Sequence, residues 1–97
     1  MKIYIAGPIT GVPDYKQHFT AAEKRLRDAG HVTMNPAILP EGFEHHEYMH
    51  ICYAMIDVCE AVYMLTDWRN SKGALMEYNR ALFLKMPLLF EGDEIDG

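Results

Sequence analysis

The sequence lacks the cysteine content of a disulfide-stabilised secreted protein. It has two cysteines in 97 residues, Cys52 and Cys59, and both fall in one predicted helix. At a rise of about 1.5 Å per residue they lie roughly 10 Å apart along that helix, which is too far for a disulfide within it. Reduced thiols are typical of the cytosol, so we predict a cytoplasmic protein.

Other absences narrow the class of partner. The start, "MKIYIAG", has no charged region before a long apolar core, which argues against a signal peptide. No apolar run approaches the length of a membrane span. A basic excess is also missing, because nine lysines and arginines against fourteen acidic residues give a formal charge of −5. We therefore expect neither a membrane nor a nucleic acid as partner.

The sequence does contain an alternation of short apolar runs and helical patterns. The predicted strands cover 2–6, 31–35, 61–65 and 87–91, and the predicted helices cover 14–30, 44–58 and 73–85. This βαβαβαβ rhythm predicts an α/β fold, a three-layer sandwich around a four-stranded parallel sheet with right-handed crossovers. We favour the flavodoxin-like or Rossmann-like strand order 2-1-3-4. We expect a single domain over 1–92, with 93–97 as an acidic tail.

The third helix has both an inner face and a start that we can predict. Ser71 is a good residue to cap its first turn. Its periodicity favours Leu75, Tyr78 and Leu82 as the side chains that face the core.

Ligands of such sheets bind beyond the carboxyl ends of the strands, at the switch point between strands 1 and 3. That rule selects three segments, Gly7–Gly11, Asn35–Pro36 and Asp67–Gly73. In "AGPITG", after the first strand, glycines allow a tight turn and let amide groups approach an anion. No G-x-G-x-x-G or Walker pattern is present, and a turn alone also explains these glycines.

The segment "DWRNSKGALMEYNRA" carries the strongest local pattern. Ser71 and Gly73 stand where free amide groups and the helix dipole favour a phosphate or carboxylate. Glu77 follows four residues after Gly73 and can face the same cleft as the Gly7 turn. The alternative is a surface glutamate stabilised by the helix dipole.

The string "HEYMH" at 46–50 matches the H-E-x-x-H pattern of zinc proteases. A catalytic zinc needs three protein ligands, so His46 and His50 require a third. Two downstream glutamates are candidates, Glu60, which begins a strand leading away, and Glu77, which lies in another helix. We favour an exposed helix start over a zinc site at His46 and His50. No metal and no cofactor are expected.

Three segments together resemble the nucleoside 2-deoxyribosyltransferase-like superfamily, in particular its short phage and bacterial branch of DUF4406-like domains. The likeness spans nearly the whole chain, and its most specific part is the spacing of Ser71, Gly73 and Glu77. The segments are "KIYIAGPITG", "NPAILPEG" and above all "DWRNSKGALMEYNRAL".

The resemblance implies N-glycosidase or deoxyribosyltransferase-like chemistry on a small-molecule nucleoside or nucleotide. Glu77 would attack the anomeric carbon with Tyr4 nearby, and water or a second base would resolve the glycosyl-enzyme. Trp68 is our inferred platform for the base. The other residues expected to bind substrate, several of them at its sugar and phosphate end, are Gly7, Pro8, Ile9, Thr10, Gly11, Asn35, Ser71 and Gly73.

Two positions depart from the superfamily pattern. Its enzymes usually carry an aspartate on the second helix that handles the proton of the leaving base, and here Cys52 stands at that position. Glu47, His50 or Asp67 could replace it as the acid, with His50 the first to test. Thr10 stands where related nucleotide hydrolases place an arginine to bind phosphate.

An enzyme and a binding module are therefore both candidates. Glu77 with the Ser71–Gly73 spacing favours the enzyme, and loss of the aspartate favours a protein that binds a nucleotide or nucleotide-derived signal without turnover. Open sheet edges and apolar helix positions predict a homodimer or larger homo-oligomer. The apolar positions are Phe83, Leu84 and Met86.

Overall fold

The computed structural model describes residues 1–93, so most of the tail expected at 93–97 lies outside the described residues. Its sheet has four parallel strands in the order β2-β1-β3-β4, which confirms the predicted order. The strands are β1 (Lys2–Ala6), β2 (Val32–Met34), β3 (Ala61–Met64) and β4 (Leu88–Phe90).

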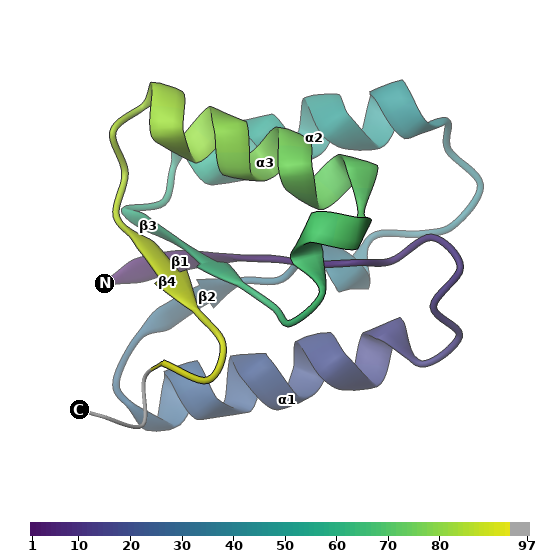
Figure 1. The fold of residues 1–97 in the computed structure, drawn as a ribbon. Helices are drawn as coiled ribbons and strands as arrows, with labels where there is room; N and C mark the ends of the chain where they lie inside the picture. Colours follow the sequence, from purple (N-terminus) through teal and green to yellow (C-terminus); the bar gives the residue numbers. More distant parts are fainter. Residues whose placement is uncertain (94–97) are drawn as a thin grey trace.

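Three helices cover the two faces of the sheet and make three layers (Figure 1). One helix packs on one face, and the other two lie side by side on the opposite face. Two short 3-10 turns follow β2 and β3. The helices are α1 (Tyr15–Asp28), α2 (His45–Asp57) and α3 (Lys72–Phe83), and the turns are η1 (Pro36–Ile38) and η2 (Trp68–Asn70).

β1 divides the core because its side chains alternate between the two faces. Ile3 and Ile5 belong to the cluster packed under α1. Tyr4 and Ala6 belong to the cluster under α2 and α3. All four side chains are fully buried, as expected for a central strand of a parallel sheet. This alternation directs the Tyr4 side chain toward the helix that carries Glu77.

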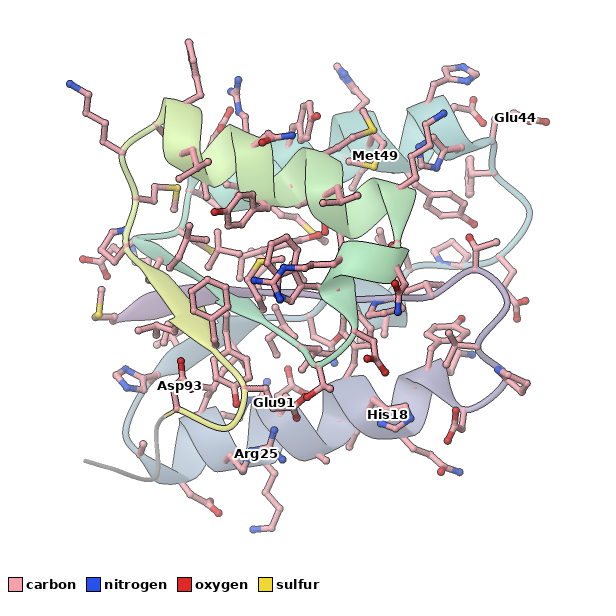
Figure 2. The ribbon with its side chains drawn as sticks, in the orientation of Figure 1. His18, Arg25, Glu44, Met49, Glu91 and Asp93 are labelled. Carbon is pink, nitrogen blue, oxygen red and sulfur yellow. The ribbon has the colours of Figure 1, made fainter. Side chains whose placement is uncertain are left out.

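Local capping fixes where the helices begin. Ser71 is the N-cap of α3, and its Oγ accepts a hydrogen bond from the Ala74 amide at 3.1 Å, as predicted. Glu44 and Glu47 form a reciprocal capping box at the start of α2. At the carboxyl end of β4, Glu91 forms a 2.6 Å ion pair with Arg25 of α1 (Figure 2).

The predicted inner face of α3 was wrong for two of its three residues, whereas Tyr78 is half-buried and packs against the core cluster. Leu75 and Leu82 are 38% and 49% exposed, and the buried residues of the helix are Ala74, Glu77 and Ala81. Small alanines let α3 approach the sheet and α2 closely. Helical periodicity alone could not choose this face, because one of its three members is a glutamate.

None of the helices within residues 1–93 is long and apolar enough to cross a membrane.

Candidate active site

A cavity of about 740 Å³ opens at the carboxyl edge of the sheet. It lies among the turn after β1, the loop before α2, and the facing sides of α2 and α3. The sequence-predicted residues that line it are Gly7, Ile9, Thr10, Gly11, Ser71, Gly73 and Glu77. Its volume is in the usual range for a small-molecule site.

Glu77 and Tyr4 form a buried pair at the wall of this cavity. The Tyr4 hydroxyl donates a hydrogen bond to Glu77 Oε2 at 2.6 Å. Tyr4 is fully buried, and Glu77 is 6% exposed although it lines the cavity. Two residues separated by 73 positions in the sequence are thus joined by one short hydrogen bond. Such a bond strengthens when the carboxyl group ionises.

Burial controls the protonation of this pair. It raises the pKa of Glu77 to about 7, although interactions with Tyr4 and Cys52 act in the opposite direction. Burial, together with the charge of Glu77, raises the pKa of Tyr4 well above its ordinary value. Near neutral pH the carboxyl group is therefore divided between its two states, and the phenol stays a hydrogen-bond donor.

Cys52 lies beside the pair on the inner face of α2. Burial and the neighbouring Glu77 raise the pKa of its thiol to about 12. A thiol of that pKa is a poor donor of protons near pH 7, so Cys52 does not reproduce the aspartate that the superfamily pattern places there.

One face of α2 lines the cavity from the cavity mouth to the neighbourhood of Glu77. His45, Met49 and Cys52 recur at helical spacing along it, and all three line the cavity. Figure 2 labels Met49 on this helix. A Cβ placed on Gly73 would lie 3.7 Å from both His45 Cε1 and Met49 Sδ, so the starts of α2 and α3 are close neighbours.

Two glycines of the β1 turn have a structural reason to be glycine. A Cβ on Gly7 would lie 2.8 Å from Leu65 Cβ and Cδ1, closer than side-chain atoms can pack. Gly11 has a φ of +78°, a conformation that residues with a side chain rarely adopt. The turn therefore follows a path along the cavity that other residues would not easily allow.

Several of the predicted site residues lie elsewhere. Pro8 and Asp67 line a second cavity of about 870 Å³, next to the first, which does not include Glu77 in its lining. Asn35 is buried, and its Oδ1 accepts the Ala37 amide at 2.8 Å to cap η1. His50 is exposed and is not part of either lining, because it lies about 100° around α2 from the buried Met49.

Trp68 does not offer a platform to a ligand in the cavity. It is buried in the core beneath α3, stacked on Tyr78 with ring centroids 4.5 Å apart and tilted against Phe90 at 6.0 Å. An apolar environment was available to this ring because β4 and α3 bring two aromatic side chains to η2. The predicted role of Trp68 was wrong for this reason.

The "HEYMH" string forms the first turns of α2. His46 and His50 are exposed, and Glu47 Oε1 accepts the Glu44 amide at 2.8 Å in the capping box. Within residues 1–93, no three histidine, cysteine, aspartate or glutamate side chains gather closely enough to hold a metal ion. The pattern matches because capping favours a glutamate at this position.

Sequence reasoning missed several residues of the cavity lining, among them three around the start of α2. His45 begins α2, Tyr48 lies one turn further on, and Phe43 precedes the helix. The signal available was an aromatic residue inside the polar stretch "EGFEHHEY". It was not recognised because an irregular loop has no periodicity that shows which way its side chains point.

The parallel sheet in the order β2-β1-β3-β4 with helices on both faces is an α/β fold that this chain shares with solved 2-deoxyribosyltransferases. One solved structure of this fold is the 2-deoxyribosyltransferase of the psychrotolerant bacterium Bacillus psychrosaccharolyticus, with a TM-score of 0.70 and 23% identity, over 93% of this chain and 71% of that one. Another is the 2-deoxyribosyltransferase of Leishmania mexicana, with a TM-score of 0.72 and 21% identity, over 92% of this chain and 62% of that one. The predicted resemblance is thus confirmed at the level of the fold.

The family can be stated more closely. The model of the DUF4406 family, described as a domain of unknown function, matches residues 1–90, and the chain belongs to this family. No match was found among curated proteins.

Proposed function

We propose that the protein breaks the N-glycosidic bond of a nucleoside or nucleotide, with Glu77 as the nucleophile. The observation that carries the proposal is the buried Glu77–Tyr4 pair at the wall of a ligand-sized cavity. A buried carboxyl group with a pKa of about 7 is available in its ionised form at neutral pH. The two neighbours of the same fold are both named 2-deoxyribosyltransferases, so 2′-deoxynucleosides are the first substrates to test.

The reaction would proceed in two steps. A carboxylate oxygen of Glu77 forms a bond to the anomeric carbon while the bond to the base nitrogen breaks, and the base leaves with the electron pair. Water then attacks the same carbon and gives its proton to the group that protonated the leaving base, the ester bond to Glu77 breaks, and the carboxylate is restored. Attack by a second base in place of water would give transfer. Tyr4 fixes one carboxylate oxygen at 2.6 Å and leaves the other for the sugar.

The departing base also needs a proton. We place His45 in this role, because it lines the cavity at the starts of both α2 and α3 and its imidazole is a common general acid in enzymes. His50 and Asp67, the acids expected from the sequence, lie outside the lining that contains Glu77. Cys52 lies closer to Glu77, but its raised pKa of about 12 disfavours proton transfer.

A second candidate is a module that binds a nucleotide or nucleotide-derived signal without turning it over. The specific observation in its favour is Cys52, a neutral thiol beside the carboxylate where an enzyme needs an acid. Loss of general-acid help typically costs 10²- to 10⁴-fold in rate. Slow turnover and mere binding are therefore different outcomes that an assay can separate.

The test is a panel of nucleosides and 5′-monophosphates incubated with the protein and analysed for free base by chromatography. We expect the wild-type protein to release base and Glu77→Gln to lose this activity. Glu23→Gln is the matched control, because Glu23 lies on α1 across the sheet from α3. Intact ligand recovered from a tight wild-type complex, without free base, would support the binding module instead.

A further inference from the structure

Phe43 is an exposed aromatic residue at the edge of the cavity. It lies in the loop between η1 and α2, lines the cavity, and is 50% exposed. Exposure of a large aromatic ring inside a cavity wall leaves apolar surface in water that a ligand can cover. Leu39 and Gly42 of the same loop also line the cavity, so this loop forms one continuous wall.

Tyr48 holds this loop in place. Its hydroxyl donates a hydrogen bond to the Pro40 carbonyl at 2.6 Å and accepts one from the Phe43 amide at 3.2 Å. The two rings meet edge to face, with centroids 5.9 Å apart and an interplanar angle of 77°. Because such rings are not stacked on one another, flat ring surface stays available for a third ring.

The spacing along α2 relates this wall to Glu77. Tyr48 and Cys52 are one helical turn apart, about 6 Å along the axis. Cys52 lies beside Glu77, and Phe43 lies against Tyr48. In a nucleoside the base is bonded directly to the anomeric carbon, so the base of a sugar held at Glu77 can extend along the cavity wall toward Tyr48 and the Phe43 ring.

We propose that Phe43, positioned by Tyr48, is the wall on which the base of the substrate stacks. The proposal rests on the proposed function and adds a specificity to it, since a stacking wall selects ligands that carry a flat heteroaromatic ring. In this proposal Phe43 has the role of base platform that the sequence analysis assigned to Trp68. Tyr48 is a positioning residue, since it acts through the loop.

The test measures binding in the Glu77→Gln background, so that ligand is not consumed. Thymidine and 2′-deoxyadenosine are titrated by calorimetry, with 2-deoxyribose as a probe that has no base. Base stacking on an aromatic side chain predicts that Phe43→Ala weakens binding of both nucleosides roughly 10- to 100-fold. Phe43→Leu, which keeps apolar bulk but lacks a flat ring, should lose most of this affinity, and Phe43→Tyr should keep it. Binding of 2-deoxyribose should not change.

Two further variants separate stacking from a general structural effect. Phe83→Ala is the matched control, because Phe83 is 76% exposed on α3 and does not line the cavity. Tyr48→Phe keeps the ring but removes both hydrogen bonds to the loop. It should weaken nucleoside binding less than Phe43→Ala and leave 2-deoxyribose binding unchanged.

The outcomes distinguish this proposal from the proposed function. If the wild-type protein releases base but Phe43→Ala does not weaken nucleoside binding, base stacking on Phe43 is contradicted and the proposed reaction is not. Binding that depends on Phe43, with no base release by the wild-type protein, supports the wall and overturns the reaction. Failure of both nucleosides to bind, together with no base released by the wild-type protein from any member of the panel, overturns both.

Discussion

Replacing Glu77 with glutamine should stabilise the folded protein at neutral and alkaline pH. Glu77 is 6% exposed, and burial raises its pKa from an ordinary 4.5 to about 7. In the range from about pH 4.5 to 7 the folded protein holds a proton that the unfolded chain releases. Stability from this group is therefore complete below pH 4.5, falls as the pH rises, and levels off above pH 7.

The size of this loss follows from the two pKa values. Their difference corresponds to about 3 kcal/mol of unfolding free energy. Glutamine carries no charge at any of these pH values, and its carbonyl oxygen can accept the Tyr4 hydrogen bond. Glu77→Gln should therefore match the wild type near pH 4.5 and exceed its stability by about 3 kcal/mol at pH 8. For a domain of this size that is a rise of roughly 10–20 °C in Tm.

The assay is urea unfolding of both proteins at intervals from pH 4.5 to 8, read as the difference between them. Taking the difference cancels titrating groups that the two proteins share. Glu23→Gln is again the control, because it removes a carboxylate from the other face of the sheet and should show no gain with rising pH. A stability difference that does not change with pH, or a Glu77→Gln protein less stable than wild type at pH 8, would refute the reasoning.

Three further predictions concern the pH profile, the β1 turn and assembly. Base release should rise with pH through about 7 as Glu77 ionises. Tyr4→Phe should move this rise to higher pH, because the hydrogen bond from Tyr4 lowers the pKa of Glu77. A pH profile of base release that is the same in the variant and the wild type would contradict the role of Tyr4. Gly7→Ala should lower the unfolding free energy by about 1–3 kcal/mol, measured by urea unfolding, because its Cβ would lie 2.8 Å from Leu65. The control is Gly92→Ala, where a Cβ meets nothing within 4 Å and only a modest strain cost is expected from its φ of +98°. An equal loss of stability in the two variants would argue against the clash. Light scattering should give the mass of a dimer or larger assembly, and a monomer at micromolar concentration would contradict that prediction.

The fold could be predicted because its signals are local and repeated. The strands are apolar runs bounded by turn residues, and β1 begins and ends where the sequence predicts. Parallel pairing and strand order follow from the alternation of strands and helices, since few connections satisfy right-handed crossovers. The proximity of Tyr4 to Glu77 was implied by the family resemblance, and the structure gives its physical reason, because the alternation along β1 directs Tyr4 to the face that α3 covers.

The rest of the site depends on rotations and loop paths that local patterns do not determine. His50 and His45 both belong to α2, but only the rotation of the helix places His45 at the cavity and His50 in solvent. Trp68 was expected at the cavity and is buried in the core, whereas Phe43, for which the sequence analysis made no prediction, lines the cavity. The 3-10 turn η2 inserts Trp68 into the core, and the hydrogen bonds of Tyr48 direct the loop that carries Phe43 to the cavity.

The most direct test of the account is mass spectrometry of the protein quenched in acid during incubation with a 2′-deoxynucleoside that it cleaves. We predict a protein population heavier by one 2-deoxyribosyl group, with the added mass on the peptide that contains Glu77, and no such population for Glu77→Gln. A sugar attached to a different residue, or base released by Glu77→Gln at the wild-type rate, would contradict the assignment of Glu77 as nucleophile.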